Sequence, residues 1–173
     1  HLSCINYQIN VNTGFVYYNL EKDSVSKIDN SASPCILFLL DGEVSIDSGE
    51  YQNVHIEKDK MVLIPQHVDN KIEVIYDAKC LLLFWNKDIR VCDKVYMNSL
   101  SSYKERKKEM CVLPIRDPLQ AVLNSVVAYL YAKMQCKHMH LIKQQEVLLV
   151  LRGYYTKKEL FTFFSSILGN TGH

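Results

Sequence analysis

The chain has 173 residues, of which 48% are hydrophobic and 23% charged, and its formal net charge is +1. This length suits one domain, or one domain with a helical extension, and the composition is ordinary for a soluble globular protein. No run of about 20 apolar residues is present, which excludes a membrane-spanning helix, and no signal peptide is recognisable. Because the sequence begins at His1 rather than Met, we expect a trimmed chain.

The charge is divided unevenly along the chain. Residues 1–100 carry 9 Lys and Arg against 14 Asp and Glu, whereas residues 101–173 carry 11 against 5. We interpret the second half as a solvated basic surface that complements an acidic first half. A position near nucleic acid is the alternative, although no cluster of Lys and Arg supports direct DNA binding.

The six cysteines form no C-x-x-C pair. A chain of this size does not need disulfides to hold it together. We therefore expect reduced thiols in a cytoplasmic protein, with one or two disulfides as the alternative.

The first half of the chain has the pattern of short strands. Polar and apolar residues alternate in segments such as 43–47 and 51–57, and turn residues such as Asp41-Gly42 separate these segments. The run from Cys80 to Trp85 is apolar and is expected to be buried on both faces. Strands spaced about 8–12 residues apart predict a sandwich or barrel. The expected strands are Ile5–Val11, Gly14–Leu20, Ile36–Leu40, Glu43–Asp47, Tyr51–Glu57, Met61–Pro65, Lys71–Tyr76 and Lys79–Trp85.

From Asp117 onward the pattern changes to helices. Asp117, as N-cap, followed by Pro118 predicts a helix start, and apolar residues then recur every three or four positions for about four turns. A second helix is expected at about 139–152, ended by Gly153. The segment Thr156-Lys157-Lys158-Glu159 is a capping box, which predicts a third helix ending near Gly169.

No residue pattern points to catalysis or to a metal. His55 stands alone in its strand, His67 follows a proline, and His138 and His140 lie on the link into a helix. Zinc and iron sites need three or four convergent ligands. A G-x-S-x-G elbow and a Gly-rich phosphate loop are also missing. We therefore expect no cofactor, no metal and no enzyme.

Two stretches resemble known families. The segment from Gly42 to Trp85 resembles a cupin barrel core, although Asp59-Lys60 replaces a glycine of that pattern and the metal-binding His pair is missing. The helical half is similar to the region after the barrel in AraC-type transcriptional regulators. Together, the two resemblances cover about residues 36–169. The matching helical residues are Cys136, Glu146, Leu151, Arg152, Tyr154, Tyr155, Lys158, Glu159, Leu160, Phe163 and Phe164.

The resemblance implies an α+β protein in which a cupin-like β-barrel or jelly roll precedes about three helices. We expect a cupin-like effector domain at residues 1–100, a connector at 101–116 and a helical dimerisation segment at 117–169. In the family a two-helix DNA-reading domain follows this region, so DNA is expected to be contacted only through a domain absent from this chain.

The expected function is therefore effector sensing and homodimerisation in a transcriptional regulator. A small molecule, such as a carbohydrate or another metabolite, would bind inside the barrel. A metal-dependent cupin enzyme and a ligand-free association module with a filled barrel are the alternatives. The candidate ligand-binding residues are Tyr17, His55, His67, Tyr76 and Trp85. The candidate dimer contacts are Val122, Val126, Leu130 and Tyr131, although this stripe can equally pack within its own chain.

Overall fold

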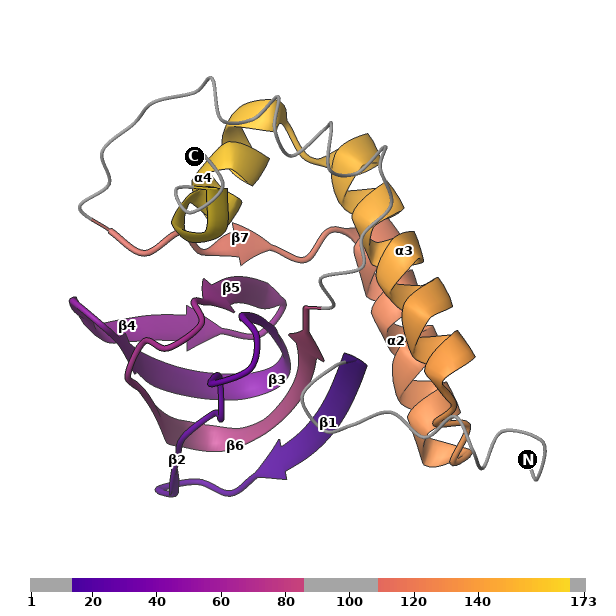
Figure 1. Ribbon diagram of the computed structural model, residues 1–173. Coiled ribbons are helices and arrows are strands. Elements are labelled where there is room, and N and C mark those ends of the chain that lie inside the picture. Colours follow the sequence, from indigo (N-terminus) through magenta and orange to yellow (C-terminus); the bar gives the residue numbers. More distant parts are fainter. Residues whose placement is uncertain (1–13, 86–108, 169–173) are drawn as a thin grey trace.

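The computed structural model describes residues 14–85 and 109–168 (Figure 1). The expected strand at Ile5–Val11 lies outside the described residues. The strands are β1 (Gly14–Leu20), β2 (Val25–Ser26), β3 (Cys35–Ser48), β4 (Tyr51–Glu57), β5 (Lys60–Ile64), β6 (Asn70–Phe84) and β7 (Leu113–Pro114), and the helices are α2 (Asp117–Tyr131), α3 (Lys137–Tyr154) and α4 (Lys157–Leu168).

The described strands form one antiparallel sheet in the order β1-β6-β3-β5-β7, with β2 added to β6 and β4 added to β3. The two long strands β3 and β6 pair with each other along most of their lengths. Each has different outer neighbours at its two ends, so the sheet curls into an open barrel (Figure 1).

Each long strand was expected as two shorter ones. Asp41-Gly42, expected to be a hairpin turn, lies inside β3, where the register with β6 shifts. Gly42 has a φ of +84°, and a Cβ there would overlap the carbonyl oxygen of Asp77. The glycine is therefore required, but it allows a bulge and a close approach of two backbones rather than a turn.

Two apolar layers lie on opposite faces of the sheet. Along β6, Leu81 and Leu83 belong to a layer shared with the helices, whereas Leu82 and Phe84 belong to the barrel core. This alternation follows from the two-residue period of a strand. The prediction that this run is buried on both faces is confirmed.

The three helices cover one side of the sheet. The hairpin of α2 and α3 lies beside β1, and α4 lies beyond β5 and β7 (Figure 1). At the helix-facing layer, the rings of Trp85 and Phe164 lie 5.6 Å apart. No helix in the described part of the chain is long and apolar enough to cross a membrane.

The helix boundaries agree in part with the sequence. The capping box is confirmed, because the backbone N–H of Thr156 donates to Glu159 and the backbone N–H of Glu159 donates to the Thr156 hydroxyl, at 2.9 and 3.1 Å. Gly153 lies inside α3 instead of ending it, and the N-cap of α2 is Arg116 rather than Asp117.

The predicted α+β fold class is confirmed by this antiparallel sheet and the helices that follow it. Two short strands, β2 and β7, were missed. Within the segment expected to be a connector, Leu113 and Pro114 form β7 and pair with Met61 and Lys60 of β5. This pairing attaches the start of the helical half to the sheet edge.

Candidate ligand cavity

A cavity of about 340 Å³ opens into the barrel between β1, β6 and the segment that follows β2. Small-molecule sites are typically concave and mostly apolar, with a few polar groups. This cavity has that character, since its deep part is apolar and its mouth carries polar side chains. It is lined by Tyr18, Leu20, Ser26, Lys27, Ile28, Asp29, Ile72, Cys80, Leu82 and Phe84.

Strand alternation places these side chains. Tyr18 and Leu20 point to the cavity from β1, while Phe15 and Tyr17 of the same strand pack with the helix-facing layer. From β6, Leu82 and Phe84 supply the apolar floor. The two faces of β1 therefore serve two different parts of the molecule.

The segment after β2 is held in place by buried amide side chains. Asn70 is 8% exposed, accepts a hydrogen bond from the Ile28 N–H at 2.8 Å and donates to the Ile28 carbonyl at 2.9 Å. The Asn30 amide donates to the carbonyls of Pro65 and Val68, each at 2.7 Å. Such satisfied buried amides fix the local backbone, so the cavity wall is preorganised.

The charges lie at the mouth rather than on the floor. Burial raises the pKa of the Cys80 thiol to about 12, so this side chain is neutral at physiological pH. Lys27 and Asp29 are exposed at the mouth. Hydrogen bonds from the Ser31 hydroxyl and N–H lower the pKa of the Asp29 carboxyl and keep it ionised. The arrangement favours a small, mainly apolar molecule with one polar end.

None of the five predicted ligand-binding residues lines this cavity. Tyr17 faces the helices, where its ring lies 5.6 Å from that of Tyr131, and burial together with Tyr131 raises its pKa to about 12. Trp85 is 6% exposed and packs against Phe164 in the helix-facing layer.

The other three predicted residues lie on the surface. The His55 ring is bound to the Glu43 carboxylate at 3.2 Å on the outside of the barrel. His67 is exposed in the loop before β6 and has a φ of 63°. Tyr76 is 55% exposed, with the ammonium of Lys22 over its ring. The structure therefore does not bring the five residues together.

The predicted dimer contacts are also divided between the interior and the surface. Val122 and Val126 are 6% and 0% exposed, because they pack into the helix-facing layer of their own chain. Leu130 is partly buried against the same layer. Tyr131 is 67% exposed and is the residue of this set that is most available to a partner.

The cupin resemblance raises the question of a metal. Among the described residues, no three His, Cys, Asp or Glu side chains are grouped so as to hold a metal ion. His55 and Glu43 form a pair, but it is exposed on the outside of the sheet. The described residues therefore do not fit a cupin metal centre.

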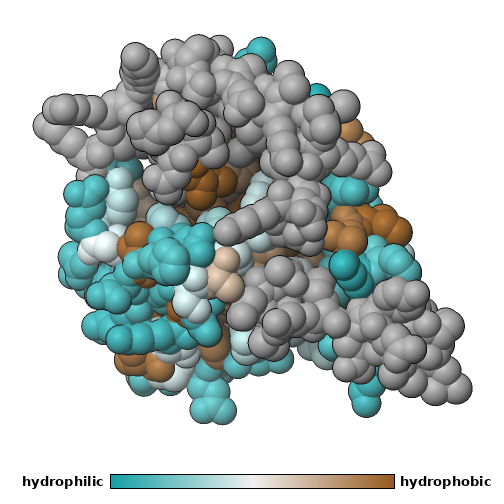
Figure 2. All heavy atoms as spheres, in the orientation of Figure 1, coloured by the Kyte–Doolittle hydropathy of each residue, from teal (hydrophilic) through white to brown (hydrophobic). Residues whose placement is uncertain are grey.

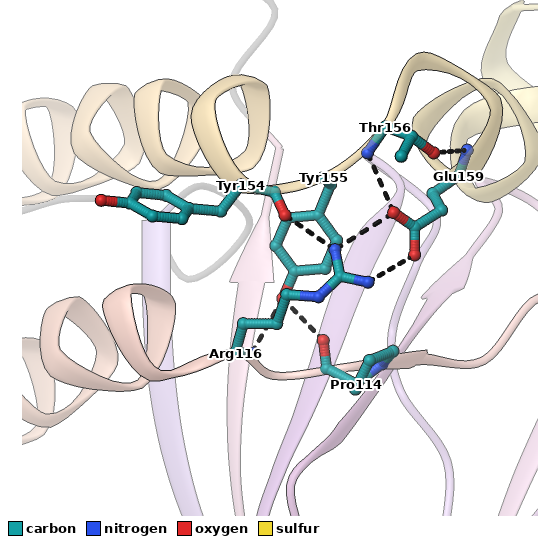
Figure 3. Close-up of polar contacts among 6 residues, drawn as sticks. All are labelled: Pro114, Arg116, Tyr154, Tyr155, Thr156 and Glu159. Atoms are coloured by element: carbon teal, nitrogen blue, oxygen red, sulfur yellow. Dashed lines mark hydrogen bonds and ion pairs between the residues drawn. The ribbon is translucent and has the colours of Figure 1, made fainter.

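A polar cluster joins the start of α2 to the α3–α4 junction (Figure 3). The Arg116 guanidinium donates to both carboxylate oxygens of Glu159, at 3.1 and 2.7 Å, and to the Tyr154 carbonyl at 2.7 Å. Arg116 also lies over the Tyr155 ring, 4.3 Å from its centroid. The Tyr155 hydroxyl donates to the Pro114 carbonyl at 2.6 Å. We name Pro114, Arg116, Tyr154, Tyr155, Thr156 and Glu159 the junction cluster.

The junction cluster is structural rather than a second binding site. Its donors and acceptors are directed at one another, and they join β7, α2, α3 and α4. The hydrogen bonds from Arg116 lower the pKa of the Glu159 carboxyl to about 2. Sequence reasoning found the Thr156–Glu159 half of this cluster but missed Arg116, which lies 43 positions away.

No family model matches the chain, and no curated protein matches it. Solved structures similar to it include two cupin proteins. A cupin-2 domain protein from Shewanella frigidimarina is 18% identical, with 39% of this chain and 65% of that chain covered and a TM-score of 0.34. An RmlC-like cupin from Methanocaldococcus jannaschii is 15% identical, with 39% and 64% covered and a TM-score of 0.36. The chain spans less than two thirds of the length of either protein.

One comparison corrects the expectation that the chain is not an enzyme. Hydroxypropylphosphonic acid epoxidase from S. wedmorenis is 15% identical, with 41% of this chain and 42% of that chain covered and a TM-score of 0.37. Because enzymes are among the similar structures, the prediction of no enzyme is withdrawn. None of these likenesses assigns an activity to this chain.

Proposed function

We propose that this chain is the effector-sensing part of an AraC-type transcriptional regulator, and that a small molecule binds in the barrel cavity. The observation that carries the proposal is the cavity itself, which has an apolar floor, a polar mouth and a wall formed by β1. The helical residues that resemble this family support the regulatory part. In that reading, DNA is contacted by a domain outside this sequence.

A ligand that fills the cavity is small and mainly apolar. The volume of about 340 Å³ lies at the lower end of the range of about 300–1,000 Å³ for small-molecule sites. Leu20, Leu82 and Phe84 offer contact area without hydrogen bonds, whereas Tyr18 and Lys27 offer donors near the mouth. A sugar, which needs many polar partners, suits this lining less well.

Two adjacent residues of β2 provide a matched test of the cavity. Ser26 lines the cavity, while Val25 beside it is 60% exposed and does not. A panel of small amphipathic molecules is screened by thermal shift, since a ligand at about 100 times its Kd adds about 2.7 kcal/mol of stability. We expect Ser26→Trp to abolish the shift of any hit and Val25→Trp to retain it. An equal response of both variants to the hit contradicts binding in this cavity.

Dimerisation is proposed through α3 rather than the buried stripe of α2. Ile142 and Leu149 are 60% and 67% exposed and lie seven positions apart, on one face of the helix. Figure 2 shows apolar atoms at the surface over the helical hairpin. In an antiparallel pair of α3 helices, Ile142 of each copy would oppose Leu149 of the other. Gly153, where an added Cβ meets nothing within 4 Å, would leave room at the ends of the pair.

Sedimentation of the 173-residue chain tests this surface. We expect Leu149→Arg to shift the chain toward the monomer mass, because it buries an unpaired charge in the proposed contact. Tyr76→Arg, at an exposed aromatic residue on the sheet, serves as the control and is expected to leave the mass unchanged. A wild-type chain that is monomeric at high concentration contradicts this part of the proposal.

A further inference from the structure

One backbone N–H of the first strand is held by a histidine from the helical half. The N–H of Phe15 donates to Nδ1 of His140 at 2.9 Å, across 125 positions of sequence. The two rings stack with centroids 6.1 Å apart. Phe15 is 3% exposed and His140 2% exposed. This contact fastens the start of β1 to α3 in a place that excludes water.

The hydrogen bond fixes the protonation state of the histidine. Nδ1 accepts a hydrogen bond from the Phe15 N–H, so in the neutral ring the proton is carried by Nε2. Nε2 is buried and has no hydrogen-bond partner among the residues that the structure describes. An apolar side chain here would leave the buried Phe15 N–H without an acceptor, so the histidine satisfies that donor while its own Nε2–H stays unpaired.

Protonation would convert the acceptor into a donor. With a proton on Nδ1, two N–H groups would face each other across the contact, and the hydrogen bond to Phe15 would be lost. Burial lowers the pKa of the His140 imidazole, so the contact withstands mild acid.

Other charged and titratable groups lie on the elements packed around this contact. β1 presents Tyr17, and α2 presents Tyr129 and Tyr131, and tyrosines are neutral in acid. On α3, the ammonium of Lys143 binds Glu146 at 3.1 Å and lies over the Tyr129 ring. Glu146 is the acidic group of this set, and its carboxylate is paired with the Lys143 ammonium.

The strand held by this contact is also a wall of the cavity. Phe15 and Tyr17 face the helices, while Tyr18 and Leu20 face the cavity. We infer that His140 is a proton-operated latch, which holds β1 against α3 while neutral and releases the start of the strand, and with it the cavity wall, when protonated. The link to effector sensing rests on the proposed function, whereas the latch itself does not.

Hydrogen exchange at a single amide tests the latch without any ligand. The Phe15 N–H is followed by NMR in the ¹⁵N-labelled 173-residue chain from pH 7.5 downward, with intrinsic exchange rates subtracted. The His140 tautomer and its protonation are read from long-range ¹H–¹⁵N spectra. We expect the Nε2–H tautomer at neutral pH. Protection of Phe15 should fall at least tenfold with the same midpoint as the protonation of His140.

Two variants separate the latch from general effects of pH. His140→Asn places an amide oxygen near the position of Nδ1 and does not titrate, so Phe15 should stay protected throughout. His138→Asn, an exposed histidine on the same helix, should behave as wild type. The latch is refuted by an Nδ1–H tautomer, by protonation of His140 with Phe15 still protected, or by a His140→Asn variant that responds to pH as wild type does.

The cavity wall is tested in the same spectra. The amide signals of Tyr18 and Leu20 should shift with the midpoint of His140. If Phe15 alone responds, the release does not reach the cavity, and that part of the inference is overturned. Because no cavity ligand is used, these outcomes are independent of the test with Ser26→Trp and Val25→Trp.

Discussion

Replacing Glu159 with glutamine measures how strongly the junction cluster stabilises the fold. Glutamine keeps the size of the side chain and an oxygen for the Thr156 N–H, but it removes the charge that Arg116 contacts with two hydrogen bonds. The Glu159 and Arg116 side chains are 25% and 35% exposed, so solvent screens the pair in part. We expect the free energy of unfolding at pH 7 to fall by about 1–2 kcal/mol.

The effect of this substitution depends on pH in a defined direction. Hydrogen bonds from Arg116 lower the pKa of Glu159 from 4.5 to about 2 in the folded chain. A carboxyl whose folded pKa is depressed contributes stability above its unfolded pKa and loses it as pH falls toward the folded value. The difference between wild type and Glu159→Gln should therefore be constant above about pH 5 and shrink between about pH 4.5 and pH 2.

Urea unfolding followed by circular dichroism at pH 7 and pH 3 gives the comparison. Glu73→Gln is the control, because Glu73 pairs with Lys71 at 3.0 Å while both side chains are more than 40% exposed. Such surface pairs contribute about 0–1 kcal/mol. The reasoning is refuted if Glu159→Gln costs no more than Glu73→Gln at pH 7, or if its cost is the same at both pH values.

Two further substitutions test the sheet and the cavity wall by urea unfolding. Gly42→Ala should cost about 2–4 kcal/mol, because a Cβ would overlap the backbone of Asp77 and φ is +84°. Gly49→Ala should cost less, since the atom it meets belongs to a side chain, and equal costs would contradict this reasoning. Asn70→Leu leaves the buried N–H and C=O of Ile28 unpaired and should cost about 2–3 kcal/mol, so a neutral result would show that these groups find other partners.

Local sequence patterns predicted most elements of this fold, with β2 and β7 missed, but not how the elements join. The alternation in β4 and the capping box at Thr156 involve residues within a few positions of each other, and both are present in the structure. Asp41-Gly42 has the residues of a turn, yet here the glycine serves a bulge opposite Asp77. The two uses of a positive φ look the same in sequence. They differ only in what lies across the sheet.

The cavity was missed for a related reason. The predicted ligand residues were chosen because aromatic and imidazole side chains are versatile in binding, and each lies on or near a strand as expected. For Tyr17 and Tyr18, the face that each side chain occupies depends on the register with β6, about 60 positions away, where Tyr17 pairs with Leu81 and Tyr18 with Cys80. A shift of one residue exchanges the two faces. In this register Tyr18, not Tyr17, reaches the cavity.

Polar contacts, rather than the apolar layer, determine how the helices sit on the sheet. Burial of apolar surface is non-directional, so the layer that contains Leu81 and Leu83 would tolerate small shifts of the helices. Two directional contacts oppose such shifts: the junction cluster holds the start of α2 and the α3–α4 junction, and His140 holds the other end of α3 on β1. Of these two, the contact at His140 lies on the strand that also forms the cavity wall. The cavity wall and this end of α3 are therefore joined directly through β1.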